Sequence, residues 1–241
     1  MPLDRLSSLI SRFTLAVAVC PPGEGNLRLL ADVGSAGSYV LEFLPGGGTF
    51  QPAAGQNLVA ARVDFGGSAN PLISALPPCL RLLPDNPETD LLLQVFVAEA
   101  EAARCGSEAA LGRLAEVLLI HLFRYQIEQG TTTPGLLAGL ADPRLSRALV
   151  AIHDRPGISW KNQDLAKIAG MSASRFADIF RITLNETPQS YLRRWRLTLA
   201  RQDIRRGDRI STIANRYGYA SAEALSHAFN RQYGCKPTAC R

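Results

Sequence analysis

The 241-residue sequence is short of several features that define large functional classes. It has three histidines, all at or after His121, and five cysteines, none of which pairs with another as Cys-x-x-Cys. Structural zinc sites and metal-binding β-barrel enzymes require clustered histidine, cysteine or carboxylate ligands. We therefore expect no metal site, no cofactor and no catalytic site in this chain.

Long apolar runs are also absent. No run reaches the roughly twenty apolar residues that a helix needs to cross a bilayer. The first twenty residues contain Asp4 and Arg12 and lack the order typical of a secretory signal peptide. We expect a cytoplasmic protein whose cysteines are reduced at rest.

Charge is distributed unevenly along the chain. The net charge is +5 overall, but residues 142–241 contain 18 basic and 8 acidic residues, a net of +10, which leaves residues 1–141 at −5. A basic half beside an acidic half indicates that only the C-terminal part meets a polyanion. Most of its basic residues are arginines, which suit bidentate contacts with phosphate and guanine.

The basic half contains a stretch with the pattern of a helix-turn-helix unit, from Asn162 to Phe180. Apolar residues at helical spacing end at Gly170, which can adopt a left-handed turn, and Ser172 can cap a second helix. In that second helix Phe176 and Phe180 form part of an apolar inner face, so we expect them in the core. Such a unit presents its second helix to the major groove of DNA.

About fifty residues later the same pattern returns, from Ile210 to Gly234. Here Gly218 opens the turn, Ser221 is the cap, and Leu225 and Phe229 lie on the inner face. Between the two units a basic helix is predicted from Pro188 to Arg201. Two such units in tandem predict an all-α DNA-binding domain.

At this point the sequence resembles the AraC/XylS family of bacterial transcription regulators. The resemblance spans roughly the last hundred residues and rests on the first unit and on the stretches Thr187–Arg201 and Ile213–Pro237. One departure is Leu225, where the family usually has phenylalanine. The resemblance implies a regulator that activates or represses transcription and, if it activates, contacts RNA polymerase.

We expect the recognition helices at about residues 172–181 and 221–231, in successive major grooves of double-stranded DNA. Their outward residues are the candidates for contacts with base edges. Arg175 suits a guanine edge, although a phosphate contact or a solvated side chain is the alternative, and Asp178 is more often paired with a nearby arginine. His227 and Glu223 either contact base edges or are solvated surface residues. The base-facing candidates are Ser174, Arg175, Ala177, Asp178, Ala222, Glu223, Ser226 and His227, and the phosphate candidates are Lys161, Arg193, Arg194, Arg196 and Arg231.

The N-terminal half predicts a different architecture. An amphipathic helix is expected at Leu3–Arg12 and a strand at Phe13–Cys20, followed by short apolar runs at Leu27–Leu30, Tyr39–Leu44 and Leu58–Phe65. Glycine and proline separate these runs, which is typical of a small β-structure. Two helices then follow, at about Thr89–Arg104 and Glu108–Gln129.

The segment Ala61–Leu82 resembles the end of a cupin-type sensor domain found in one subgroup of the same family. The resemblance rests on the Asp64-Phe65-Gly66-Gly67 turn and on the motif from Asn70 to Pro78. The stretch before it is shorter than such a domain normally needs, so a truncated barrel is expected. The fold class is therefore α+β, with a sensor and dimerisation domain at 1–129, a linker at 130–141 and the double helix-turn-helix domain at 142–241.

The signal that the sensor answers has two hypotheses. One is a small-molecule effector bound inside the domain. The other is oxidation, because the subgroup includes members that sense oxidants through cysteines and Cys20 and Cys79 occupy its characteristic places; small buried cysteines are the alternative. Arg81 is expected to lower the pKa of Cys79 slightly.

Two further alternatives stay open. The helix at 108–129 has a broad apolar stripe. Either one side closes the core of its own domain while another meets a second copy, as the resemblance implies for dimerisation, or the whole stripe is intramolecular core. A function from another class is an enzyme, such as an alkyl-transfer DNA-repair protein, that carries this DNA-binding tail. That chemistry requires an activated cysteine in a zinc–thiolate cluster, and the cysteines here are scattered.

Overall fold

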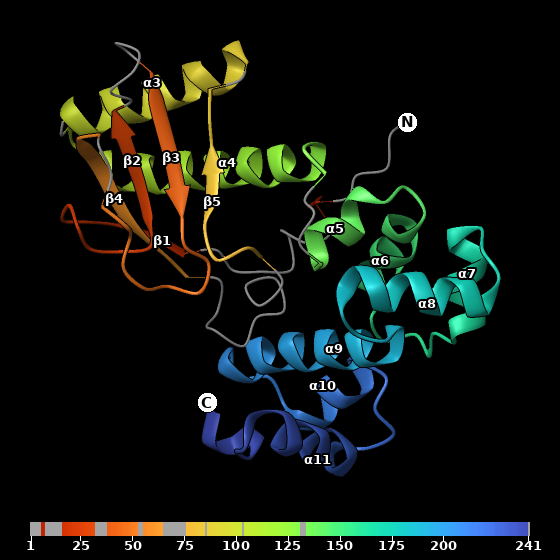
Figure 1. The fold of residues 1–241 in the computed structure, drawn as a ribbon. Coiled ribbons are helices and arrows are strands. Elements are labelled where there is room, and N and C mark those ends of the chain that lie inside the picture. Colours follow the sequence, from red (N-terminus) through yellow and green to blue (C-terminus); the bar gives the residue numbers. More distant parts are fainter. Residues whose placement is uncertain are drawn as a thin grey trace. The chain divides into compact units, whose positions relative to one another are not determined.

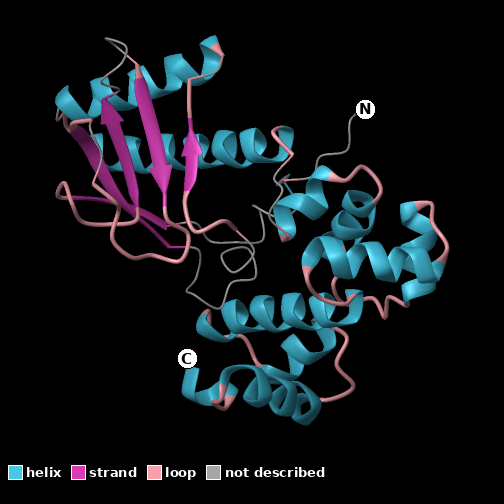
Figure 2. Cartoon of the chain, in the orientation of Figure 1, coloured by secondary structure: helices cyan, strands magenta, loops and turns pink. Residues whose placement is uncertain are grey.

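The computed structural model describes residues 6–7, 16–31, 38–52, 55–64, 76–84, 86–102, 104–130 and 134–240. The chain divides into two compact units (Figures 1 and 2). One contains the strands and the first two labelled helices, and the other contains the helices from residue 134 onward. The fold is α+β, as expected. The expected helix at Leu3–Arg12 and the motif from Asn70 to Pro78 lie largely outside the described residues.

The first unit is built on an antiparallel sheet with the strand order β1-β4-β2-β3-β5. The sheet packs against two helices that run across it (Figure 1). Each run expected as a strand contains one among the described residues, and β5 is a strand that was not expected. The bounds are β1 Ala16–Cys20, β2 Leu27–Ala31, β3 Tyr39–Phe43, β4 Asn57–Asp64 and β5 Leu80–Leu82.

Alternation along the strands gives the sheet two different faces. Leu29, Leu41 and Phe43 are completely buried on one face. On the other face the register aligns Arg28 with Glu42 and Glu42 with Arg81. Glu42 is only 2% exposed and forms ion pairs of 2.6 Å with Arg28 and 2.5 Å with Arg81, so a buried carboxylate joins three strands.

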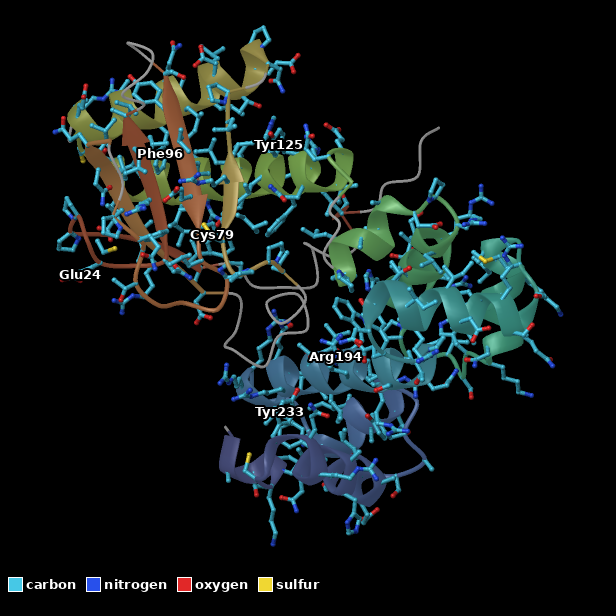
Figure 3. The ribbon with its side chains drawn as sticks, in the orientation of Figure 1. Glu24, Cys79, Phe96, Tyr125, Arg194 and Tyr233 are labelled. Atoms are coloured by element: carbon cyan, nitrogen blue, oxygen red, sulfur yellow. The ribbon has the colours of Figure 1, made fainter. Side chains whose placement is uncertain are left out.

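Helices α3 (Pro87–Ala102) and α4 (Ser107–Glu128) pack against each other and against the sheet. Phe96 of α3 is buried under the sheet (Figure 3). The apolar stripe of α4 is buried within its own unit, at Leu111, Ala115, Leu118, Leu119, Leu122 and Phe123. This side of α4 therefore closes the core of its own unit, which both alternatives for the helix expect.

The second unit is all helical. Its elements are α5 Leu136–Ala141, α6 Leu145–Asp154, α7 Asn162–Ala169, α8 Ala173–Leu184, α9 Pro188–Arg205, α10 Ile210–Arg216, α11 Ala222–Tyr233 and the short 3₁₀ helix η1 Pro237–Cys240. The linker expected over 130–141 is wrong in its second half. Leu136, Leu137 and Leu140 are buried where α5 packs on α6 and α8, so this segment belongs to the helical core.

Candidate nucleic-acid interface

The first helix-turn-helix unit consists of α7 and α8. Gly170 ends α7 with a left-handed φ of 69°, which a glycine adopts at no steric cost. Ser172 then caps α8, since its hydroxyl accepts a hydrogen bond from the backbone amide of Arg175. Phe176 and Phe180 are fully buried, so the opposite face of α8 is left outward.

The second unit repeats this construction with α10 and α11. Gly218 has a φ of 69° in the turn, and the hydroxyl of Ser221 accepts from the backbone amide of Ala224 at 3.2 Å. Leu225 and Phe229 are fully buried. Leucine thus fills the position where the sequence departs from the family pattern, and the inner face of α11 stays closed.

Helix α9 joins the two units and packs against α8, α10 and α11. Thr187 caps its N-terminus, and Trp195 is completely buried along it. Next to Trp195, the buried His153 of α6 shares a 2.6 Å hydrogen bond with the hydroxyl of Tyr191. Phe180 of α8 packs edge-to-face on Tyr191 of α9, with ring centroids 5.8 Å apart, so the first helix-turn-helix unit is fixed on the connecting helix.

The two helix-turn-helix units also touch each other directly, through backbone atoms. A Cβ added to Gly157, in the loop before α7, would lie 2.4 Å from the carbonyl oxygen of Arg216, and one added to Gly218 would lie 2.3 Å from the carbonyl oxygen of Gly157. Arg196 of α9 closes this contact, donating from Nε to the carbonyl of Pro156 at 2.6 Å and from Nη2 to that of Ile158 at 2.8 Å. We call Gly157, Gly218 and Arg196 the latch between the two helix-turn-helix units.

A second polar cluster holds α9 against the second unit. Asp203 is 6% exposed and accepts hydrogen bonds from Arg216 at 2.6 Å and from the Tyr217 hydroxyl at 2.7 Å. Arg216 also donates to Asp208 at 2.8 Å. Burial, together with the hydrogen bond to Asp203, raises the pKa of Tyr217. The cluster therefore fixes α10 on the end of α9.

The base-facing candidates of α8 lie where the sequence places them. Ser174, Arg175 and Asp178 are exposed, and Ala177 is half-buried at the edge of the same face. Within the described residues no arginine lies at ion-pair distance from Asp178. The expected pairing of Asp178 with an arginine is therefore not present in this structure.

The candidates of α11 divide into two groups. Glu223 and His227 are exposed, whereas Ala222 and Ser226 are half-buried. The Ser226 hydroxyl donates to the carbonyl of Ala222 at 2.8 Å, within its own helix. A hydrogen bond with Ser221 lowers the pKa of Glu223, with smaller help from His227, so this carboxylate is charged at neutral pH.

The phosphate candidates are not equivalent. Lys161, Arg193 and Arg231 are exposed. Arg194 is held in an ion pair with Glu186, and Arg196 is held in the latch. Burial lowers the pKa of Arg196. Arg196 is thus a correction to the phosphate set, since its guanidinium satisfies backbone carbonyls inside the domain.

Sequence reasoning missed the residues that set the position of one unit relative to the other. Gly157 sits in an Arg-Pro-Gly turn that reads only as a loop, and nothing in the sequence places it against Gly218. Gln189 was also missed. Its amide donates to the carbonyl of Trp160 at 2.9 Å and to the side-chain oxygen of Asn162 at 3.1 Å, so it ties α9 to the start of α7.

In the unit that contains the strands, the two candidate cysteines lie at different edges of the sheet. Cys20 ends β1 and is half-buried, and Cys79 precedes β5 and is exposed (Figure 3). In the strand order β1-β4-β2-β3-β5, three strands lie between the two strands that carry them.

Neither thiol is activated in this fold. Burial raises the pKa of Cys20, with a smaller contribution from Glu24. Burial also raises the pKa of Cys79, followed by the nearby Glu42 carboxylate, and these effects outweigh Arg81. Arg81 does lower the pKa of Cys79, as expected, but burial and Glu42 raise it by more, so the net shift is upward.

A cavity of about 560 Å³ opens on the same unit. It is bounded by the loops at residues 23–26 and 45–50 and by the end of β4 at residues 62–64. Glu24, Arg62 and Asp64 bring charges of both signs to its wall. Such a volume is in the range of small-molecule sites.

Within the described ranges, no helix is long and apolar enough to cross a membrane. In the same part of the chain, no group of three or more histidine, cysteine, aspartate or glutamate residues is arranged to hold a metal ion.

Two family models match the chain. A helix-turn-helix domain matches residues 165–241, and a cupin domain matches residues 9–128. The chain is 35% identical over 186 residues to a putative AraC-like transcription regulator of Streptomyces lividans, covering 75% of this chain and 61% of that protein.

Two further relatives carry regulator names. The HTH-type transcriptional regulator AlkR of Acinetobacter baylyi is 36% identical over 174 residues, which covers 70% of this chain and 57% of AlkR. The RCS-specific HTH-type transcriptional activator RclR of Escherichia coli is 31% identical over 186 residues, which covers 75% of this chain and 66% of RclR. The chain thus spans about 60% of the length of these relatives.

Proposed function

Because the chain belongs to the AraC family of helix-turn-helix proteins and has a cupin-type N-terminal domain, we propose that it is a sequence-specific DNA-binding regulator of transcription. The observation that carries the proposal is the construction of the helical unit. Two capped helices, α8 and α11, are held on one connecting helix with polar outer faces, in the half of the chain whose net charge is +10. This arrangement suits two major-groove contacts on one DNA molecule.

In this proposal α8 and α11 enter successive major grooves, which lie roughly 34 Å apart on one face of DNA. If the latch and α9 hold the two helices closer than one helical turn, the DNA bends to meet them. Base edges are read by the outward residues, with Arg175 in the first helix and Glu223 and His227 in the second as the longest side chains. Lys161, Arg193 and Arg231 neutralise phosphates.

The test is a selection of binding sequences from fragmented genomic DNA by the full chain, followed by titrations at several salt concentrations. Binding to the selected sequence should exceed binding to scrambled DNA and weaken as salt rises, because phosphate contacts release counterions. Arg193→Ala should weaken binding to both DNAs and flatten the salt dependence, whereas Arg175→Ala should reduce mainly the preference for the selected sequence. Arg113→Ala, an exposed arginine on α4, is the matched control. Failure to select any sequence contradicts the proposal.

We further infer that the sensor unit gates this binding. A small-molecule effector is the first candidate signal, because the cavity bounded by residues 23–26, 45–50 and 62–64 offers a volume and polar groups that suit one. The chemistry of its wall favours a polar compound that carries a charge. Differential scanning fluorimetry of the full chain against libraries of charged metabolites tests this. A bound compound should raise the melting temperature of the wild-type chain and not that of Arg62→Ala.

Oxidation of Cys20 or Cys79 is the second candidate signal, favoured by the exposure of Cys79. Since both thiol pKa values are raised, reaction in this conformation is slow at neutral pH and accelerates as pH rises. DNA binding is measured with reductant and after hydrogen peroxide, in the full chain and in Cys20→Ser, Cys79→Ser and the control Cys105→Ser. Binding indifferent to peroxide removes this candidate.

The other partners follow from the same proposal. A second copy of the chain is proposed to bind through the outer faces of α3 and α4, where Leu91, Val95 and Val117 are 61%, 43% and 39% exposed. An activator would also contact RNA polymerase, and a regulator of bacterial genes works in the cytoplasm. Sedimentation of the full chain and of Leu91→Glu distinguishes a dimer through this face from a monomer.

The enzyme alternative has gained no support. The relatives of Streptomyces lividans, Acinetobacter baylyi and Escherichia coli are named as transcription regulators or activators. We therefore propose a regulator without catalytic activity.

A further inference from the structure

Ile182, on the third turn of α8, is 68% exposed. This is the largest exposed fraction among the large apolar side chains of the described residues. A single exposed aliphatic residue is common on protein surfaces and needs no explanation by itself. Ile182 is unusual because of the helix that carries it and because of the face on which it lies.

Its neighbours on that face are the residues proposed to read bases. Arg175, Asp178 and Ile182 follow one another at the spacing i, i+3, i+7, which places them in one stripe along the helix. At 3.6 residues per turn, Ile182 is rotated by only about 40° from Asp178 and about 20° from Arg175. Phe176 and Phe180, which are fully buried, lie on the opposite side.

The length of the helix determines what Ile182 can reach. Seven residues at 1.5 Å each put it roughly 10 Å beyond Arg175 along α8. This distance is about three base-pair steps of 3.4 Å. The major groove is about 12 Å wide and admits an α-helix. In helix-turn-helix proteins the N-terminal residues of the recognition helix contact base edges, so a contact from Ile182 would extend the stretch that α8 reads by these three steps.

The floor of the major groove offers an aliphatic side chain one matching group. Most base edges there are hydrogen-bond donors or acceptors, and the apolar exception is the C5-methyl group of thymine. Covering this methyl with Ile182 removes two apolar surfaces from water at once. We propose that Ile182 reads a thymine through its C5-methyl group, an assignment that rests on the proposed DNA-binding function.

A protein partner is the other conceivable occupant, and the surroundings favour DNA. Exposed Arg181 and Arg175 lie near Ile182 and Asp178 lies one turn before it, so two positive charges and one negative charge surround it, and the net positive charge suits a polyanion. Within residues 134–240, the other exposed large apolar side chain is Ile158, in the loop before α7. One isolated isoleucine does not form the contiguous apolar patch that protein docking sites present.

The experiment combines a protein variant with the removal of single methyl groups from DNA. The probe is the duplex selected by the full chain, and each thymine in it is replaced in turn by uracil, which lacks only the C5-methyl group. Affinities are measured for the wild-type chain, Ile182→Ala and the conservative Ile182→Val. Leu83→Ala is the matched control, because it truncates an exposed aliphatic side chain, 44% exposed, at the end of β5 and outside the helical unit.

We expect one thymine at which uracil weakens wild-type binding about three- to tenfold, the loss expected for a buried methyl contact. Ile182→Ala should bind the thymine duplex more weakly than the wild type by a similar factor. It should bind the uracil duplex as well as the wild type does, so that discrimination at this position disappears. Ile182→Val should retain part of the discrimination, and Leu83→Ala should retain all of it.

Two outcomes overturn the assignment. In the first, Ile182→Ala discriminates thymine from uracil at every position as the wild type does, whatever its affinity. In the second, Ile182→Ala binds all duplexes normally and loses only transcription activation, which assigns Ile182 to a protein contact. Failure of the wild-type chain to select any duplex is a different result, since it contradicts the DNA-binding function itself.

Discussion

Replacing Gly157 by alanine tests whether the latch sets the distance between the two recognition helices. Gly157 lies in the loop before α7, and Gly218 lies in the turn before α11, so each glycine belongs to the approach of one recognition helix. The added Cβ would lie 2.4 Å from the carbonyl oxygen of Arg216, which is backbone and has no rotamer through which to escape. The two helix-turn-helix units must therefore move apart.

The magnitude follows from that distance. Carbon and oxygen atoms in contact are more than 3 Å apart, so the loops must move by roughly 0.6–1 Å. The two hydrogen bonds of Arg196, to Pro156 and Ile158 on either side of Gly157, are strained by the same movement. Overpacking of this kind costs about 1–3 kcal/mol of stability. The same movement misaligns the recognition helices on DNA. If this weakens the specific complex by about 1.4 kcal/mol, its affinity falls about tenfold.

The assay measures affinity for the selected duplex and for duplexes with one base pair inserted or deleted between the two recognised elements. The wild-type chain should prefer one spacing, and Gly157→Ala should bind the original spacing about tenfold more weakly and show a flatter preference. Gly139→Ala is the control for destabilisation, since its Cβ would lie 2.8 Å from a Leu184 side-chain carbon, far from the latch in sequence and contacts. Gly46→Ala, with open space around its Cβ, is the neutral control.

One result would refute the reasoning. If Gly157→Ala is folded, as judged by circular dichroism and thermal unfolding, and keeps both the affinity and the spacing preference of the wild type, the latch does not set the geometry of DNA binding. Equal losses in Gly157→Ala and Gly139→Ala would also contradict it, because stability alone would then explain the effect.

Three further predictions concern buried charge and helix capping. Glu42→Gln should lower the free energy of unfolding by about 2–3 kcal/mol, because Arg28 loses a buried partner while the exposed Arg81 contributes little, whereas Glu116→Gln should change it by less than about 0.5 kcal/mol; urea unfolding of both variants decides. Burial alone would raise the pKa of Glu42, but the hydrogen bonds from its two arginines lower it below the ordinary 4.5. The stability that Glu42 contributes is therefore present above pH 4.5 and lost as pH falls through the folded-state pKa. The difference in unfolding free energy between wild type and Glu42→Gln should shrink below about pH 4, and a constant difference would contradict the lowered pKa. Ser172→Ala should cost about 1 kcal/mol in thermal unfolding through the lost cap of α8, and no loss would mean that the hydrogen bond at 3.4 Å is not made in solution.

The helical unit was the more predictable half because its signals are local. Gly170 and Ser172 specify a turn and a cap within three residues, and the apolar spacing of Phe176 and Phe180 gives the buried face directly. The linker prediction over 130–141 failed in part for the opposite reason. Leu136, Leu137 and Leu140 form a helix because α6 and α8 cover them, and that partner surface is not local.

The candidate site shows the same division. Exposure of Arg175, Asp178, Glu223 and His227 follows from helical periodicity, so the sequence alone identifies the outward faces. The fate of Arg196 does not follow from it, since an arginine on a basic helix looks like a phosphate contact until the carbonyls of Pro156 and Ile158 are placed beside it.

The sequence by itself determined the two helix-turn-helix units, the basic C-terminal half, the strands of the sensor and the family, because each is written in short-range periodicity, in turn residues or in composition. Only the tertiary structure decided which arginines are held by carbonyls or carboxylates inside the domain, that one side of α4 closes the core of its own unit, that the pKa of Cys79 is raised, and that Gly157 and Gly218 meet. Those properties depend on contacts between residues far apart in the chain. Burial, desolvation and close backbone approach arise only when such segments are packed together.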